Sequence, residues 1–377
     1  MEIEFSPLLR AARRASEWQS GFDPRPGLLA SNEDGQVLWA VQSGAGWLRQ
    51  QLAAKSSEEV LRVGVSGYGL FSTLQDVHGM DVVELRCDGL QFELNPGTAY
   101  EDSAPLTDQW STPAQADALA LELAKASWSV SLLADDLAQV LQLGCWAAAN
   151  EATDQALAQV ELHLDADAIR MVAGNGIKLA TATATALAPV SEPQLLVLPA
   201  AMASRWLAVV RSMPETARVT ITRHARELSL HFGSREVVLI SPASTAPETG
   251  LFSLLGDLET RQPMALAQME GLDRKRVKAV CAVSQAVMLS TTETGMALTT
   301  QHKESLGRHR SAELDVGGAA HPGEIAIDAP ELHAALQLMD GAVSFSICHS
   351  TANRILLLEQ LQDSSVQPRI GLVALNI

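Results

Sequence analysis

The sequence of 377 residues and 40.2 kDa is too long for one ordinary hydrophobic core and fits two or three domains. Apolar residues make up 47% of the chain, which excludes a largely disordered protein. Lysine and arginine number 27 against 44 acidic residues, and the formal charge of −17 excludes a protein that coats nucleic acid by its overall charge. The total does not exclude a protein that gathers its few cations on one surface.

The first third of the chain opens with a predicted helix at 5–18, where FSPLLRAARRASEW repeats apolar residues at helical spacing. A second helix is predicted from Ser66 to His78-Gly79. The strands VVELR (82–86) and LQFEL (90–94) follow it. A segment at 96–115 that is rich in proline, serine and threonine closes this part of the chain.

The middle third repeats the same order. A helix is predicted at 133–149, and Asp135-Asp136 at its start fit the helix dipole better than a catalytic pair. Alternating residues at 159–187 predict strands, in which Gly174-Asn175-Gly176 fits a tight hairpin turn. A helix from Pro199 to Pro214 and three more strands, ARVTIT, ELSLHF and REVVLIS, complete this part.

The last third repeats the order once more, with helices predicted at about 271–284 and from Ala329 to Gly341. The strands VSFSIC and RILLLEQ follow the second of these helices. Taking Ser66, Pro199 and Ala329 as equivalent starts gives intervals of 133 and 130 residues. The sequence therefore predicts an α+β fold of three repeated domains at 1–124, 125–258 and 259–377, here called copies one, two and three.

Catalytic and metal-binding patterns are not found in the sequence. It has no phosphate-binding GxxxxGK[ST] loop and no HExxH motif, the histidines are scattered, and the four cysteines lie far apart. We therefore expect neither an enzyme nor a metal site nor a cofactor. The N-terminus lacks the features of a signal peptide and no apolar run is long enough to span a bilayer, so we expect a cytoplasmic protein without a membrane partner.

The middle and last thirds resemble the bacterial DNA polymerase III beta subunit, the sliding-clamp family. The similar segments are VSLLADDLAQVL, IRMVAGNGIKLA, LPAAMASRWLAVV and RELSLHFGSREVVLIS in copy two, and IAIDAPELHAALQLM and RIGLVALNI in copy three. The N-terminal third matches more weakly, through FSPLLRAARRASEW and the later helix and hairpin. The order and spacing of the segments over the whole chain carry the resemblance.

The resemblance implies three clamp-type domains, each of two helices packed on antiparallel sheets, in a crescent that dimerises head to tail into a ring. Such a ring is a processivity factor: it encircles double-stranded DNA without reading sequence and tethers its partners through a peptide-binding cleft. The implied partners are a second copy of the chain, DNA polymerase subunits, the clamp loader and repair proteins.

The resemblance places the helix cations at the hole of the ring, where they meet phosphates without reading bases. A loop arginine, Arg25, matches a family position that meets DNA. The implied DNA-binding residues are Arg10, Arg13, Arg14, Arg25, Arg205, Arg211, Arg274, Lys275, Arg276 and Lys278.

The resemblance also implies a cleft between copies two and three that accepts a short peptide with apolar anchors. Aliphatic side chains, one cation and a C-terminal strand suit such a ligand. The matching positions are Leu157, Gly174, Gly176, Ile177, Lys178, Leu179, Pro247, Leu372, Val373, Ala374, Leu375, Asn376 and Ile377.

Several positions depart from the family pattern. The helix at 133–149 has no lysine or arginine, the second helix of copy one has none, and the second helix of copy three offers only His333. In the cleft, Ile177-Lys178 replaces the usual His-Arg, and Val373-Ala374-Leu375-Asn376-Ile377 replaces the usual Met-Pro-Met-Arg-Leu end. An alternative is therefore a clamp-like scaffold or decoy that binds client proteins without encircling DNA.

Overall fold

The computed structural model describes residues 2–19, 27–31, 36–56, 62–75, 81–88, 91–95, 106–109, 125–150, 154, 156–188, 190–233, 237–244, 247–253, 264–269, 274–292, 295–301, 311–314, 323–349, 354–361 and 364–375. Among these residues helices are few and every strand pairing is antiparallel, so the predicted α+β class is confirmed. None of the described helices is long and apolar enough to cross a membrane.

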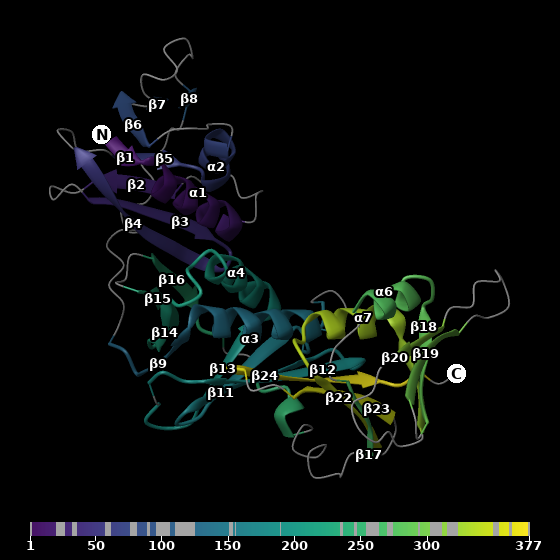
Figure 1. The fold of residues 1–377 in the computed structure, drawn as a ribbon. Helices are drawn as coiled ribbons and strands as arrows, with labels where there is room; N and C mark the ends of the chain where they lie inside the picture. Colours follow the sequence, from purple (N-terminus) through teal and green to yellow (C-terminus); the bar gives the residue numbers. More distant parts are fainter. Residues whose placement is uncertain are drawn as a thin grey trace. The chain divides into compact units, whose positions relative to one another are not determined.

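The order of elements repeats three times as strand, helix, four strands, helix, three strands (Figure 1). Copy one has β1 Glu2–Glu4, α1 Phe5–Gln19, β2 Gly27–Ser31, β3 Gln36–Ser43, β4 Gly46–Ser56, β5 Arg62–Val65, α2 Gly67–Gln75, β6 Val82–Asp88, β7 Gln91–Asn95 and β8 Leu106–Gln109. Copy two has β9 Trp128–Leu133, α3 Ala134–Ala147, β10 Gln159–Leu164, β11 Ala168–Gly174, β12 Lys178–Thr185, β13 Gln194–Pro199, α4 Ala200–Val210, β14 Arg218–Arg223, β15 Glu227–Phe232 and β16 Val237–Pro242. Copy three has β17 Met264–Met269, α6 Arg274–Cys281, β18 Ala286–Thr292, β19 Gly295–Gln301, β20 Ser311–Leu314, β21 Gly323–Asp328, α7 Ala329–Gln337, β22 Val343–His349, β23 Arg354–Gln360 and β24 Val366–Val373.

The strand pairing repeats as well. The four strands between the helices pair in the same order in every copy, as β4-β3-β2-β5, β12-β11-β10-β13 and β20-β19-β18-β21. The other strands pair as β1-β6-β7-β8, β9-β14-β15-β16 and β17-β22-β23-β24. The predicted helices and strands of all three copies are thus confirmed within a few residues of their ends.

Two pairings join strands of different copies. Strand β16 of copy two pairs with β4 of copy one, from Val237↔Gln50 to Ile240↔Trp47. Strand β24 of copy three pairs with β12 of copy two, from Lys178↔Leu372 to Ala184↔Val366. Both pairings join the third middle strand of one copy to the last strand of the next, so they are equivalent.

The chain divides into two compact units, each of which contains one of these pairings. The first comprises Met1–Ala138, Ala186–Glu192 and Ala201–Ser244, and the second comprises Gln139–Thr185, Pro193–Ala200 and Thr245–Ile377. Copy two is shared between them, so the domain boundaries 1–124, 125–258 and 259–377 stay a prediction.

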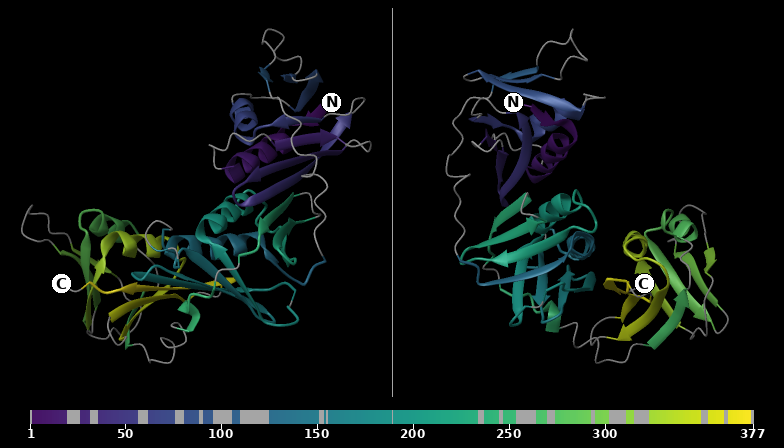
Figure 2. Two further views of the ribbon diagram at one scale, coloured as in Figure 1. Left: turned by 180° about the vertical axis from the view of Figure 1, so that it is seen from behind. Right: turned by 60° about the vertical axis from the view of Figure 1, so that its left-hand side comes forward.

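One part of the core of the first unit lies where α1 and α2 pack beside each other (Figure 2). Helix α1 buries one stripe, including Leu8, Ala11, Ala15 and Trp18, because these residues recur at intervals of three or four. The indole of Trp18 donates to the carbonyl of Gly46 at the start of β4. Helix α1 is thereby held against strands β3 and β4.

The Gly174-Asn175-Gly176 segment forms the predicted hairpin turn between β11 and β12. The Asn175 side-chain oxygen accepts from the amides of Ile177 and Lys178, each at 3.0 Å. Gly176 has φ +87°, in the left-handed region where glycine avoids the penalty that a Cβ would bring. The turn therefore places Ile177 and Lys178 at the start of β12.

Candidate functional site

Helix α1 carries three of the arginines that were expected to meet DNA. Arg10 and Arg13 are exposed, and Arg13 pairs with Glu17 one turn further on at 3.0 Å. Arg14 is only 8% exposed, and its Nε donates to Gln50 Oε1 at 2.7 Å. Since Gln50 in turn donates to the Ala11 carbonyl, Arg14 joins α1 to β4, and the expectation that it meets DNA is corrected.

Arg205 also has an internal partner, because its Nη1 donates to the carbonyl of Trp18 at 2.9 Å. Trp18 lies in the last turn of α1, where carbonyls lack helical partners and an arginine can cap them. Arg205 therefore joins α4 to α1, and its role as a DNA contact stays a prediction.

The remaining expected DNA contacts are distributed along the chain. Arg211 is exposed directly after α4, and Arg276 is exposed on α6. Arg274, Lys275 and Lys278 belong to the same helix, but their side chains lie outside the described part, as does all of Arg25. Among the cations whose side chains are described, Arg10, Arg13, Arg211 and Arg276 are therefore the exposed members of the set.

Several residues that were expected to line a peptide cleft lie where β24 pairs with β12, within the second unit. The amide of Val373 donates to the Ile177 carbonyl at 2.9 Å, and Lys178 lies opposite Leu372. Leu157 precedes β10 at the same end of the sheet, and Asp154 holds its amide. The structure thus brings these cleft positions to one corner of the sheet.

Alternation along β12 divides the cleft residues between the two faces of the sheet. Lys178 points to the same side as buried Ala180 and Ala182, where its Nζ lies 3.0 Å from both carboxylate oxygens of Glu331 in α7. The same Nζ lies 4.5 Å from the ring centre of Trp146, which belongs to α3. With its side chain 10% exposed, Lys178 is engaged within the protein, on the face of β12 opposite to Leu179.

The opposite face carries the apolar residues. Ile177, Leu179 and Val373 share this face, and Ile177 is 55% exposed. A Cβ at Gly174 would lie 3.3 Å from Leu179 Cδ1 and 3.5 Å from Leu251 Cδ1, so Leu251 lies at the same corner. We call Ile177, Leu179, Leu251 and Val373 the outer-face patch.

The other expected cleft positions differ in exposure. Pro247 and Gly176 are exposed, Leu157, Ala374 and Leu375 are half-buried, and Gly174 and Leu372 are buried. Asn376 and Ile377 lie outside the described residues. Sequence reasoning missed Leu251, Trp146 and Glu331; Leu251 offered one signal, since it lies four residues after Pro247.

The same outer face holds a cluster of ionisable residues from β10 and the segment 247–253. Glu161 is fully buried and accepts from the amide and the hydroxyl of Thr249 at 2.5 and 2.6 Å. Its burial raises the pKa, but the hydrogen bonds from His163 and Thr249 together outweigh that effect and hold the pKa of Glu161 below its ordinary value. Glu161 is therefore a buried carboxylate that stays ionised.

Comparison with known proteins places the fold. No protein-family model and no curated protein matches the chain. Among solved structures, the DNA polymerase III beta subunit of Thermotoga maritima matches with a TM-score of 0.79 at 15% identity, covering 100% of this chain and 99% of that one. The sliding clamp of Pseudomonas aeruginosa bound to griselimycin gives 0.80 at 15% identity, and the beta subunit of Borrelia burgdorferi gives 0.81 at 10%, each with the same coverage.

The chain therefore has the sliding-clamp fold over its full length, as the resemblance in the sequence implied. At sequence identities of 10 to 15%, these matches show that the fold is shared and nothing more. The particular fold is that of the DNA polymerase III beta subunit in a divergent form.

Proposed function

We propose that the protein is a DNA sliding clamp, a cytoplasmic processivity factor that encircles duplex DNA and tethers polymerases and repair proteins. Two chains would pair head to tail into a ring, and the outer-face patch would accept peptides from the partner proteins. The role is mechanical, so the proposal involves no catalysis and no cofactor.

The observation that carries the proposal is the repeated pairing of sheet edges. Each junction within the chain joins the third middle strand of one copy to the last strand of the next, β4 to β16 and β12 to β24. The two strands that complete the series are β20 of copy three and β8 of copy one. In the described part of the chain, β20 pairs only with β19 and β8 only with β7, so each has an edge open to a partner.

The same rule applied between chains generates a closed dimer. If β20 of one chain pairs with β8 of a second, then β8 of the first pairs with β20 of the second, so two contacts close the assembly. Closure would satisfy the backbone groups of four open strands that otherwise invite aggregation. The internal repeat and the fold both support the proposed ring.

The exposed cations supply the proposed contacts with DNA. Arg10 and Arg13 on α1 and Arg276 on α6 occupy the first helices of copies one and three, which are equivalent positions in the repeat. Sparse arginines would neutralise phosphates without holding one register, and such contacts suit a protein that slides. The net charge of −17 would keep DNA from other surfaces.

A second candidate is a clamp-like scaffold that binds client proteins without DNA. The specific observation in its favour is the shortage of cations on the helices: α3 has none and begins with Asp135 and Asp136, and α2 has none. The internal engagement of Arg14 and Arg205 reduces the available positive charge further.

Retention on DNA of defined topology separates the two candidates. The protein would be loaded onto a nicked circular plasmid by the clamp loader from the same cells and passed through a sizing column at moderate salt. A ring stays with the circle and is released when a restriction enzyme linearises the plasmid. A scaffold elutes away from DNA in both cases, and retention that survives linearisation would contradict topological binding.

A further inference from the structure

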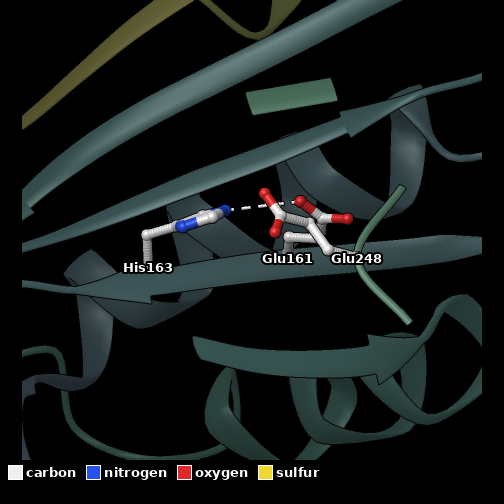
Figure 3. A group of neighbouring side chains, drawn as sticks. All are labelled: Glu161, His163 and Glu248. Atoms are coloured by element: carbon white, nitrogen blue, oxygen red, sulfur yellow. Dashed lines mark hydrogen bonds and ion pairs between the residues drawn. The ribbon is translucent and has the colours of Figure 1, made fainter. Parts of the chain in front are cut away.

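Strand β10 presents two ionisable side chains on one face of its sheet. Glu161 and His163 are two residues apart, and alternate residues of a strand point to the same side. They face the segment 247–253, from which Glu248 approaches the pair (Figure 3). The Glu161 side chain is 0% exposed and the His163 side chain is 16% exposed, so the group lies partly beneath this segment.

The spacing of the three side chains fits a shared metal ion. One ligand atom from each of Glu161, His163 and Glu248 lies within 4.8 Å of the other two. His163 Nε2 and Glu161 Oε2 form a hydrogen bond of 3.3 Å, which is longer than the usual length of about 2.9 Å. Ligands at roughly 2.0–2.1 Å from a tetrahedral zinc ion are separated by about 3.3 Å, which is the distance between the His163 and Glu161 atoms.

The surroundings hold two of these ligands in place. Glu161 Oε1 accepts both hydrogen bonds from Thr249, which leaves Oε2 directed toward His163. The imidazole of His163 stacks on the Phe252 ring, with centroids 3.9 Å apart and planes inclined by 20°. Ligands that are already hydrogen-bonded and packed lose little conformational freedom when an ion binds. Thr249 and Phe252 would thus act like the outer-shell residues that orient ligands in known metal sites.

The charge of the cluster also favours a cation. Two carboxylates this close repel each other, and a metal ion bound between them would remove that repulsion. Arg170 lies opposite His163 on the neighbouring strand β11. Its guanidinium forms an ion pair with Asp165 at 3.4 Å and so does not neutralise the two glutamates. Glu248 is exposed and has no hydrogen bond or ion pair within the part of the chain that the structure describes, so it is available to an ion from solvent.

We propose that Glu161 Oε2, His163 Nε2 and a Glu248 carboxylate oxygen bind one divalent transition-metal ion, with zinc as the test ion because proteins bind it through both imidazole and carboxylate groups. Water completes the coordination on the exposed side. The ion would join β10 to the segment 247–253, which carries Leu251 of the outer-face patch. This site is independent of whether the protein encircles DNA.

Zinc binding by untagged full-length protein tests the proposal. Isothermal titration after treatment with a chelator should give one zinc ion per chain bound through this site. Glu248→Gln and His163→Ala should each weaken that binding at least tenfold, because each removes a ligand. The matched controls are Glu192→Gln, an exposed glutamate outside the cluster, and His333→Ala on α7, and both should bind zinc as the native protein does.

Two results would overturn the proposal. One is no zinc binding by the native protein at 1:1 stoichiometry, and the other is equal affinity in Glu248→Gln and the native protein. Because Glu248 is exposed, that variant should keep its fold, which circular dichroism verifies. A zinc-dependent rise in melting temperature that is present in the native protein and absent in Glu248→Gln would support the link between β10 and the segment 247–253.

Discussion

The ammonium of Lys178 lies 3.0 Å from both carboxylate oxygens of Glu331, and this ion pair connects β12 to α7. The two side chains are 10% and 28% exposed, and Trp146 covers the ammonium from a further direction. Since water screens the pair only partly, each charge depends on the other more than in an exposed pair. The ion pair therefore reinforces the β12–β24 pairing that joins copies two and three.

A double-mutant cycle with Lys178→Met and Glu331→Gln should show this dependence. We expect each single change to lower the free energy of unfolding by about 1–2 kcal/mol and the coupling energy to be about 1 kcal/mol. The control is the more exposed pair Arg369–Glu359, which joins β24 to β23 and should couple by less than about 0.5 kcal/mol. Urea denaturation measures both cycles, and equal coupling in the two would contradict the account.

Charge reversal of exposed helix arginines should weaken the proposed DNA binding. The variant Arg10→Glu, Arg13→Glu, Arg276→Glu should bind duplex DNA at least tenfold more weakly at low salt. The dependence of log affinity on log salt should become shallower by about 0.9 for each phosphate that an arginine no longer neutralises. Reversal of Arg170, Arg226 and Arg369, which are exposed on strands and turns, is the control. Fluorescence anisotropy at several salt concentrations decides, and equal losses in the two triple variants would argue against a DNA-facing helix surface.

Deletion of Ala374–Ile377 should abolish binding of client peptides while the fold persists, because these residues are expected cleft positions that directly follow Val373 of the outer-face patch. The deletion removes the backbone hydrogen bonds from Ala374 to the Arg354 carbonyl and from Leu375 to the Ala326 carbonyl. It leaves the β12–β24 pairing, which ends at Lys178↔Leu372, in place. Anisotropy with labelled peptides that carry aliphatic anchors measures the effect. If truncated and full-length proteins bind such peptides equally well, the pocket lies elsewhere.

The contribution of Glu161 to stability should depend on pH. Because its folded-state pKa is below the ordinary value of 4.5, its stabilisation is complete above that pH and is lost as the pH falls through the folded-state pKa. Glu161→Gln should be less stable than the native protein by about 1–3 kcal/mol at pH 7 in the presence of a chelator. Urea midpoints at pH 7 and pH 3.5 should show this difference shrinking, and a difference that grows at acidic pH would contradict the assignment.

Most of the fold could be predicted from the sequence because apolar residues recur at regular intervals along the helices and strands. Apolar residues spaced by three or four predicted α1 and α4, because only a helix brings such residues to one face. Alternation of apolar and polar residues predicted β10 to β12, because only a strand brings alternate residues to one face. The pairing of β12 with β24 could not be derived from such patterns, because it joins segments far apart in the chain. The resemblance to a known family was needed to place the two copies side by side.

The candidate site could be predicted only in part. Arg14 was grouped with Arg10 and Arg13, although it follows Ala11 by three residues and precedes Trp18 by four, so it borders the buried stripe of α1. Lys178 and Leu179 were assigned to one cleft, although neighbours in a strand point to opposite faces. The sequence contains a signal for each of these placements. The partner of Lys178, 153 residues away, left no local signal.

Open strand edges give the assembly its most specific test. Neighbouring amides of an edge strand point alternately toward the sheet and away from it. The variants Ala312→Pro and Glu313→Pro in β20 should therefore have different effects. The proline whose lost amide points toward β19 removes a hydrogen bond within the sheet and destabilises copy three. The proline whose lost amide points away from β19 leaves the sheet intact and blocks pairing between chains. A fully dimeric protein in both variants would place the dimer contact away from β20.

Sedimentation equilibrium of the native protein tests ring closure most directly. At micromolar concentration we expect a single species of about 80 kDa, twice the chain mass of 40.2 kDa, because β8 and β20 of two chains would complete each other's sheets. Only monomer of 40.2 kDa at that concentration would contradict the ring, and with it the proposal that this chain encircles DNA.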